Sequence, residues 1–328
     1  MKEVKKAGKR AATFRLPGSK SHTQRTLVAA ALAEGESRLR NPLLSEDTEL
    51  LMGALRNLGA EIEVSPEDVV VRGTGGRWKQ PDRPLFVGNN GTALRFLAAV
   101  AALSEGTVVL DGTDRLRERP VGPLLGMLRS QGIATRCTRE EGYPPVEIDG
   151  GTLRGGTVSL DRMDSSQYVS AMLLAAPYAR RDLEVVLPGR TVSLPYIDMT
   201  LETMERFGIK GIRREKGRCL VPAPQGYGGR EVLIDGDASS ASYFFLAAAV
   251  GNGRAVVENW NPRTAQGDRA FLALLAALGC LVEEEGDRAV VTGGDLKAGD
   301  LSFDMGAMPD LVPTLAVLSA FRKGRTEI

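Results

Sequence analysis

Hydrophobic and polar positions follow one pattern that recurs about every 70 residues. Each block begins with small polar residues and continues with about four apolar helical turns, and a short strand-like stretch follows it at once. The blocks lie at 18–35, 89–106, 164–179, 237–253 and 308–324. Because one such unit cannot bury its hydrophobic face alone, the repeat predicts several units that pack on one another.

A second amphipathic helix follows the first in each complete block and ends near a glycine. We expect these second helices at 46–58, 121–131, 195–207 and 268–278. A β-hairpin comes next, as in Glu61–Val64 with Val69–Arg72 or Leu281–Glu284 with Ala289–Thr292. The sequence therefore predicts an α/β (α+β) protein built from β-α-β-α-β-β units, four complete and a fifth cut in half.

Two stretches are candidate crossings between domains. The Pro- and Gly-rich segment 222–229 is the better linker signal, and 14–18 precedes the first helix. Crossings there predict one complete domain of three units, 15–229, and a discontinuous second domain made of 1–14 and 230–328.

The final block stops at Ile328, where its strand is still in progress. We therefore expect the second domain to be truncated in its fifth unit. The missing neighbours would leave Leu311, Leu315 and Leu318 exposed, and apolar patches of that kind favour association or disorder.

The composition restricts the classes of protein to which this chain can belong. With 328 residues, 43% of them hydrophobic, the chain can build two sizeable cores. Its apolar helices are shorter than the roughly 18 residues of a membrane span, and a net charge of +1 does not favour nucleic-acid binding. Cys137, Cys219 and Cys280 lack metal-ligand spacing and indicate reduced thiols in a cytoplasmic protein without a metal site.

Cations mark the start of the first helix. Within Gly18–Arg25, Ser21 and Gln24 fit a capping box, but Lys20 and Arg25 do not belong to one. Positive charge at a helix N-terminus is unfavourable by roughly 0.3–1 kcal/mol. An anion bound among the free N–H groups would explain these cations; two solvated surface charges are the plain alternative.

The same chemistry recurs at three further helix starts. Gly88–Thr92 leads into a helix that carries Arg95, and Arg119 precedes Pro120, which we expect at the first helical position. Asp164–Gln167 supplies hydroxyls and an amide, although such a cap is usually structural. Four such starts, if they converge, would form an anion-selective site.

Several other chemistries are excluded. His22 is the only histidine, so Ser-His-Asp or Cys-His catalysis would have to use it, and we expect it to be solvated. Gly73–Gly76 and Gly293–Gly294 lack the helix and the Lys-Ser/Thr of a P-loop and indicate turns.

Motifs at six places have the sequence and order of a known family. They are Leu16–Ser21 with Arg25, Gly88–Ala93 with Arg95, Arg117–Pro120, Ser165–Gln167, Asp237–Ala241 and Pro309–Asp310. From about residue 14 to Ile328 the chain resembles the EPSP synthase (3-phosphoshikimate 1-carboxyvinyltransferase) family. The resemblance implies two domains, each of three β-α-β-α-β-β units, in agreement with the repeat.

The resemblance also implies a reaction. The enolpyruvyl group of phosphoenolpyruvate would pass to the 5-hydroxyl of shikimate 3-phosphate with release of phosphate, in the shikimate pathway to chorismate and the aromatic amino acids. It implies no cofactor and a monomer when the chain is complete. Glyphosate, a phosphoenolpyruvate competitor in this family, is a candidate inhibitor, because Gly91 leaves room where some insensitive relatives carry alanine.

Roles follow by motif match. For shikimate 3-phosphate the resemblance implies binding by Lys20, Ser21, Arg25, Ser165, Ser166, Ser193, Tyr196 and Asp310. For phosphoenolpyruvate it implies Lys20, Gly91, Arg119 and Gln167. Asp310 and Lys20 are the implied catalytic residues, with Asp310 accepting the 5-hydroxyl proton.

The chain departs from the family in two ways. Relatives continue beyond the position of Ile328 with further acidic and basic site residues, and some have proline at Phe96. The related UDP-N-acetylglucosamine 1-carboxyvinyltransferases carry a reactive cysteine before the second helix of unit two, but 111–119 has none. That family and a non-catalytic anion-binding fragment are the alternatives.

Overall fold

The computed structural model describes residues 10–160, 164–189 and 193–328. They form two compact units, which we call the large unit (20–234) and the small unit (10–19 with 235–328). The divisions thus lie a few residues beyond the expected crossings. The segment 222–229 is not a linker, because it packs into the large unit, where the Tyr227 hydroxyl donates to the Leu174 carbonyl at 2.9 Å.

Three four-stranded sheets of one topology build the large unit. In each sheet a short edge strand runs parallel to the strand that follows the first helix, and an antiparallel hairpin completes the order. The strands are β13 (Glu231–Leu233), β2 (Glu36–Arg40), β4 (Asp68–Arg72) and β3 (Glu61–Val64); β5 (Leu85–Phe86), β6 (Val108–Asp111), β8 (Val146–Ile148) and β7 (Thr135–Cys137); β9 (Gly156–Ser159), β10 (Leu183–Val186), β12 (Arg218–Val221) and β11 (Arg213–Glu215). The predicted β-α-β-α-β-β repeat is confirmed.

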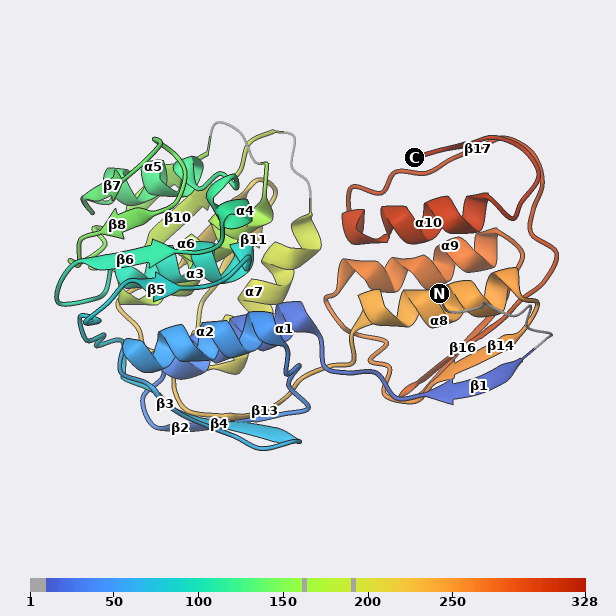
Figure 1. The fold of residues 1–328 in the computed structure, drawn as a ribbon, viewed down its shortest axis with the longest axis horizontal. Coiled ribbons are helices and arrows are strands. Elements are labelled where there is room, and N and C mark those ends of the chain that lie inside the picture. Colours follow the sequence, from blue (N-terminus) through green and yellow to red (C-terminus); the bar gives the residue numbers. More distant parts are fainter. Residues whose placement is uncertain (1–9, 161–163, 190–192) are drawn as a thin grey trace. The chain divides into compact units, whose positions relative to one another are not determined.

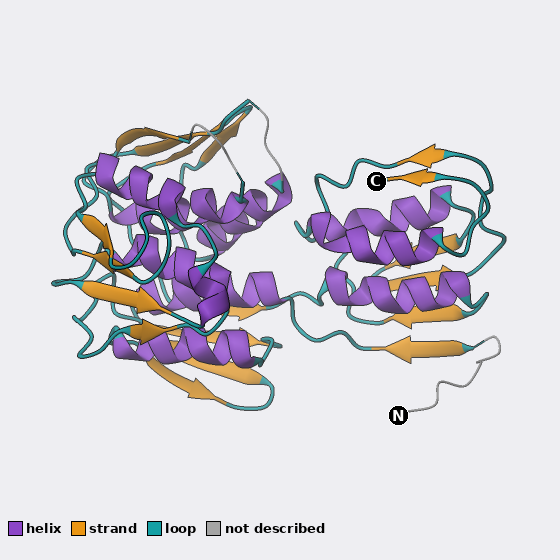
Figure 2. Cartoon of the chain, turned by 45° about the horizontal axis from the view of Figure 1, so that its top comes forward, coloured by secondary structure: helices purple, strands orange, loops and turns teal. Residues whose placement is uncertain are grey.

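Each sheet of the large unit has a first and a second helix. The first helices are α1 (Lys20–Leu32), α3 (Gly91–Ala101) and α6 (Ser166–Ala175), which η1 (Ala176–Tyr178) extends; the second helices are α2 (Glu46–Asn57), α5 (Gly122–Ser130) and α7 (Leu194–Arg206). Figures 1 and 2 show the strands at the periphery of this unit and the first helices between the sheets. Because α3 packs on α6, and α7 on both α6 and α1, the first helices are buried almost all round.

The small unit repeats this topology once. Its sheet has the order β1 (Ala11–Phe14), β14 (Arg254–Val257), β16 (Arg288–Thr292) and β15 (Leu281–Glu285). Its helices are α8 (Ala238–Val250) and α9 (Phe271–Ala277), the latter preceded by η2 (Gly267–Ala270). The strand before α1 belongs to this sheet, whereas the strand before α8, β13, belongs to the large unit.

A further strand-helix-strand segment completes the described part of the small unit. It comprises β17 (Leu301–Ser302), η3 (Pro309–Leu311), α10 (Val312–Ser319) and β18 (Thr326–Glu327), with β17 parallel to β18. The expected exposure of Leu311, Leu315 and Leu318 is wrong: all three are at most 1% exposed. They face the core because α10 packs against α8.

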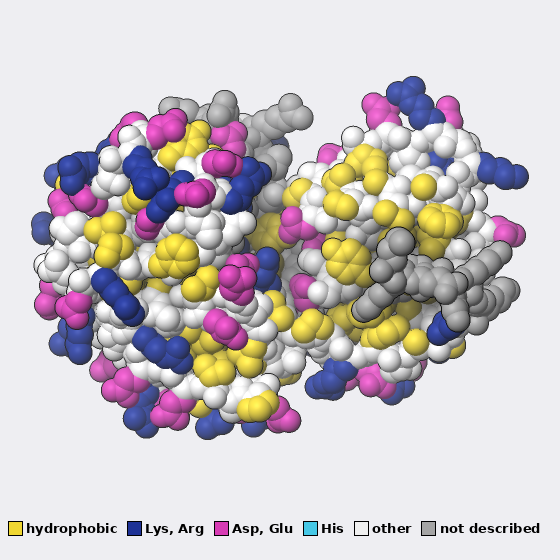
Figure 3. Space-filling model, viewed as in Figure 1, with side chains coloured by type: hydrophobic (Ala, Val, Ile, Leu, Met, Phe, Trp, Pro, Cys, Tyr) yellow, Lys and Arg dark blue, Asp and Glu magenta, His cyan; other side chains and the backbone are white. Residues whose placement is uncertain are grey.

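Other apolar side chains of the small unit remain on its surface. Tyr243 on α8 and Phe321 after α10 are 62% and 61% exposed, and Figure 3 shows apolar side chains over these helices. The first helices of the large unit expose no comparable side chains, because helices of neighbouring repeats cover them.

Candidate functional site

The start of α1 presents Lys20 and buries its neighbours. The helix begins at Lys20, so Ser21 is not its N-cap and the expected capping box is wrong. The Lys20 ammonium lies 3.4 Å from the Asp47 carboxylate on α2, and about half of its side chain is exposed. The Gln24 side chain is buried and accepts a hydrogen bond from Asn90 at 2.9 Å, which joins α1 to the start of α3.

Arg25 is a buried cation that joins α1 to α7. Its guanidinium donates to the Thr200 hydroxyl at 2.8 Å and to the carbonyls of Ser21 and Tyr196 at 3.0 and 3.1 Å. Burial lowers the pKa of Arg25 to about 10, while Tyr196 acts in the opposite direction. The group therefore keeps its charge at neutral pH although it is 1% exposed.

Phe96 supports that cation. Its ring is fully buried, and the Arg25 guanidinium carbon lies 5.2 Å from the ring centre. The Tyr196 ring centre is 5.7 Å from the same carbon. Such cation–π contacts stabilise a desolvated guanidinium by about 2 kcal/mol. The sequence alone does not reveal this role, since Phe96 and Arg25 lie on different helices.

Arg119 lies against the start of α3 and not at the start of α5. Asn90 caps α3 by accepting the Ala93 N–H at 2.9 Å, and Arg119 donates to the Asn89 carbonyl at 3.1 Å. A methyl group on Gly91 would lie 2.5 Å from the Arg119 guanidinium carbon. Glycine is therefore required here for Arg119 to keep its place.

One expectation around this segment is wrong. Pro120 does not occupy the first position of a helix, because α5 begins at Gly122 and a short helix, α4 (Asp114–Arg117), precedes Pro120. The expectation that Gly91 leaves room for glyphosate stays a prediction, and the side chain nearest to Gly91 is Arg119.

Arg95 and Gln167 join the starts of α3 and α6. Arg95 is 5% exposed and donates to the Gln167 side-chain oxygen and, at 3.0 Å, to the Pro120 carbonyl. The Gln167 amide nitrogen donates to Thr92 at 2.9 Å. Burial lowers the pKa of Arg95, an effect that Tyr168 opposes and Arg119 adds to.

The starts of α6 and α7 contribute hydroxyl groups. Ser165 caps α6 by accepting the Gln167 N–H at 3.3 Å, and Ser166 is 4% exposed. Ser193 precedes α7 with a φ of 58°, in the left-handed region, and is half-buried like Tyr196. Hydrogen bonds thus connect α1, α3, α6 and α7 near their N-terminal ends. Binding of an anion by these ends stays a prediction.

His22 is buried in the large unit, and Asp310 belongs to the small unit. His22 is 3% exposed, so the expectation that it is solvated is wrong. Asp310 belongs to the small unit, where it lies in η3 with an exposed side chain.

Acidic residues begin the helices of the small unit. Asp237 caps α8 and accepts from the Ser240 N–H and hydroxyl at 3.3 and 2.6 Å. Asp268 in η2 is 4% exposed and accepts from the Ser239 hydroxyl. Burial raises the pKa of Asp268 to about 6; the Ser239 bond opposes this, while Asp310 and Asp237 add to it.

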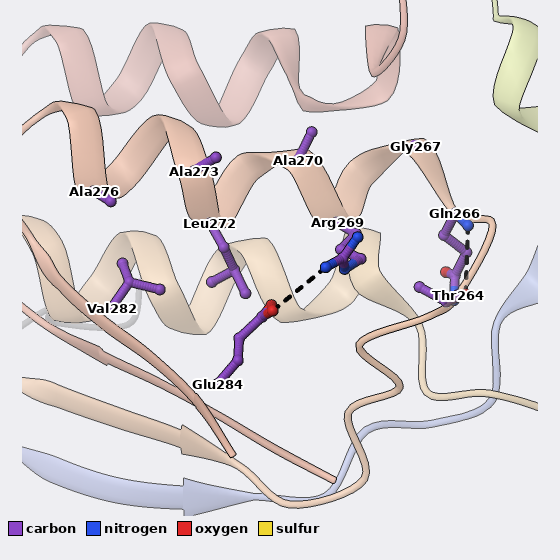
Figure 4. Close-up of a pocket in the computed structure, with 10 residues that line it drawn as sticks. All are labelled: Thr264, Gln266, Gly267, Arg269, Ala270, Leu272, Ala273, Ala276, Val282 and Glu284. Atoms are coloured by element: carbon purple, nitrogen blue, oxygen red, sulfur yellow. Dashed lines mark hydrogen bonds and ion pairs between the residues drawn. The ribbon is translucent and has the colours of Figure 1, made fainter. Parts of the chain in front are cut away.

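The small unit also contains an open groove beside α9. It has a volume of about 620 Å³ and is lined by residues of η2, α9 and β15, among them Arg269, Leu272 and Glu284. Figure 4 shows Arg269 and Glu284 pointing toward each other, 3.5 Å apart, beside the apolar Leu272 and Val282. Because Arg269 and Glu284 neutralise each other, we assign no charged ligand to this groove.

Among residues 10–160, 164–189 and 193–328, no group of three His, Cys, Asp or Glu side chains is arranged to hold a metal ion. No helix within these ranges has the length and apolar character needed to cross a membrane. The three cysteines are free, and burial raises the pKa of Cys219 and Cys280.

The chain is similar to proteins of one known family. Residues 4–328 match the family model described as EPSP synthase (3-phosphoshikimate 1-carboxyvinyltransferase). The chain is 42% identical to 3-phosphoshikimate 1-carboxyvinyltransferase of Syntrophobacter fumaroxidans, over 97% of this chain and 75% of the relative. It is 43% identical to the protein of that name from Methanoculleus marisnigri, over 99% and 77%.

A solved structure is also similar. EPSP synthase from Acinetobacter baumannii matches with a TM-score of 0.82 and 28% identity, over 98% of this chain and 74% of that chain. The matches do not bear out the predicted loss of the family's C-terminal part, since they extend over nearly all of this chain. From the family model and these relatives, the chain belongs to the EPSP synthase (3-phosphoshikimate 1-carboxyvinyltransferase) family.

Proposed function

We propose that the linked helix starts of the large unit bind the two anionic substrates of the family's reaction. In that reaction, the enolpyruvyl group of phosphoenolpyruvate passes to the 5-hydroxyl of shikimate 3-phosphate and phosphate is released. The observation that carries the proposal is the concentration of Lys20, Arg25, Arg95 and Arg119 at helix ends whose dipoles already favour anions.

For shikimate 3-phosphate we propose the residues at the starts of α1, α6 and α7. Lys20, Ser21, Ser165, Ser166, Ser193 and Tyr196 are the proposed contacts. Arg25 would act mainly through its buried charge and its bonds to the Ser21 and Tyr196 carbonyls. A buried charge acts strongly on a phosphate because less solvent screens it.

For phosphoenolpyruvate we propose Lys20, Gly91, Arg119 and Gln167. Arg119 is suited to a carboxylate or a phosphate, because its planar guanidinium can donate two parallel hydrogen bonds. Gly91 supplies a backbone N–H at the start of α3 and admits Arg119. Glyphosate would compete for the same place.

For catalysis we propose Asp310 and Lys20. Asp310 is exposed and would accept the 5-hydroxyl proton as the new C–O bond forms. Lys20 would stabilise the anionic groups of phosphoenolpyruvate through its ammonium group. A monomeric state and a cytoplasmic location, the latter supported by the three free cysteines, complete the proposal.

Arg119→Ala tests the assignment, with Arg117→Ala as its matched control. Arg117 lies two positions away, but its guanidinium is 2.7 Å from the Asp111 carboxylate. We expect Arg119→Ala to weaken phosphoenolpyruvate binding by about 1.5–3 kcal/mol and to change shikimate 3-phosphate binding much less. Calorimetry on both variants measures this, and equal losses for the two ligands would refute the assignment.

A further inference from the structure

Arg95 has the features of a functional cation, although the motif match gives it no role. It is 5% exposed, and its Nε lies buried without a hydrogen-bond partner among the described residues. Burial and the nearby Arg119 guanidinium lower the pKa of Arg95, and the Tyr168 hydroxyl opposes them. Burying a cation beside a second cation is costly, so a functional role explains Arg95 better than stability does.

The contacts of Arg95 determine how Gln167 is presented. A glutamine amide can turn its oxygen or its NH₂ group toward a ligand, and the side chain alone does not select between them. Arg95 has only donors, and it donates to the Gln167 oxygen. The amide nitrogen is thereby directed to the opposite side, where it donates to Thr92 at 2.9 Å.

Two further contacts hold Arg95 in place. Arg95 also donates to the Pro120 carbonyl at 3.0 Å, and its guanidinium carbon lies 5.1 Å from the centre of the Tyr168 ring. The Tyr168 hydroxyl donates to the same Pro120 carbonyl at 3.0 Å. Pro120 follows Arg119, so this cluster also anchors the segment that carries Arg119.

We propose that Arg95 is a positioning residue that fixes the Gln167 carboxamide with its NH₂ group available to an anionic oxygen of phosphoenolpyruvate. The proposal rests on the proposed function, in which Gln167 contacts that substrate. With Arg95 in place, Gln167 can only donate; without it, the amide can turn and present an oxygen that repels the anion.

Two measurements test the proposal, and the first needs no ligand. In ¹⁵N spectra of the free protein, the side-chain amide signals of Gln167, identified by their loss in Gln167→Ala, should shift in Arg95→Met. They should stay in place in Arg117→Met, where the lost arginine is paired with Asp111. Unchanged Gln167 signals in Arg95→Met would overturn the proposal, whether or not the protein binds either substrate.

The second measurement is a double-mutant cycle on phosphoenolpyruvate binding. Arg95→Met should weaken that binding roughly 10-fold to 100-fold in the native background and leave shikimate 3-phosphate binding within about twofold. In the Gln167→Ala background the same substitution should have no further effect. An equal loss in both backgrounds would overturn the proposal.

A third variant covers the case in which Arg95→Met does not fold. Gln167→Glu keeps an oxygen for Arg95 but replaces the donating NH₂ group with a second oxygen. We expect it to raise the melting temperature through the new ion pair and to weaken phosphoenolpyruvate binding at least 10-fold. Unimpaired binding by Gln167→Glu would contradict a donor role for Gln167. Failure of the native protein to bind either substrate would instead refute the proposed function, while the ligand-free spectra still decide the role of Arg95.

Discussion

The first helices α1 and α3 of the large unit and α8 of the small unit begin with side chains of opposite charge. In the large unit, Lys20 begins α1, and Arg95 and Arg119 lie at the start of α3. In the small unit, Asp237 caps α8 and Asp268 precedes α9. Acidic groups are what a helix dipole favours, so α8 follows the local rule and α1 and α3 depart from it. The second helix of the first repeat, α2, follows the rule with Glu46, Asp47 and Glu49 in its first turn.

We infer from this difference that the cations of the large unit serve binding and not stability. Both units share one topology, so the fold itself does not require cations at helix starts. Residues that break a local rule within an otherwise consistent fold usually mark a functional site. The cations of the large unit are therefore better explained by an anionic ligand than by the repeat.

The largest expected effect concerns the support of Arg25. Phe96→Ala should lower the free energy of unfolding by about 3–5 kcal/mol, because it removes a fully buried ring and the cation–π contact with Arg25. Urea unfolding measures this. The control is Phe86→Ala, whose ring is 52% exposed and whose loss should cost much less. Similar losses for both variants would show that the ring does not support the cation.

The buried carboxyl group of Asp268 predicts how the free energy of unfolding depends on pH. The pKa of Asp268 rises from 3.8 to about 6, so the folded protein binds a proton more tightly than the unfolded chain between about pH 4 and 6. Its contribution to the unfolding free energy therefore falls as pH rises through that window and is constant above it. Relative to Asp268→Asn, the native chain should lose up to about 3 kcal/mol between pH 4 and 7.

Denaturant unfolding of both proteins at several pH values measures this difference. Asp287→Asn, in an exposed turn of the small unit, is the control and should show no such trend. A native chain that gains stability relative to Asp268→Asn as pH rises would reverse the sign and exclude the explanation.

Gly91→Ala should disturb the cationic site without touching its charges. A methyl group 2.5 Å from the guanidinium carbon must displace Arg119. Binding of phosphoenolpyruvate and of glyphosate should each weaken by about 1.4 kcal/mol, a factor of ten. Calorimetry with both ligands tests this, and unchanged glyphosate binding would show that Arg119 adjusts at no cost.

The smallest expected effect comes from removing the carboxylate nearest to the Lys20 ammonium. Asp47 is the carboxylate that faces Lys20 at 3.4 Å, and both side chains are partly exposed. Asp47→Asn should therefore change the unfolding free energy by less than about 1 kcal/mol. It should tighten shikimate 3-phosphate binding a few-fold at low salt and less at high salt. Weaker binding at low salt would mean that Asp47 itself assists the ligand.

Patterns along the chain predict the elements of this fold well, but not their contacts. The second helix of the first unit is expected at 46–58 and lies at Glu46–Asn57, because apolar spacing and the flanking glycine are local signals. The predicted solvent exposure of His22 and Leu311 is wrong, because their burial depends on helices far away in the sequence. The pairing of Arg25 with Phe96 and of Arg95 with Gln167 requires the packed structure for the same reason.

A titration with shikimate 3-phosphate followed by backbone ¹⁵N spectra tests the central claim most directly. The claim is that the cationic helix starts of the large unit bind the anionic substrate. The largest shifts should fall on amides at the starts of α1, α6 and α7, near Ser21, Ser166 and Tyr196, and they should diminish as salt rises. Largest shifts at the acidic start of α8, near Ser239, or no shifts at millimolar ligand, would contradict the claim.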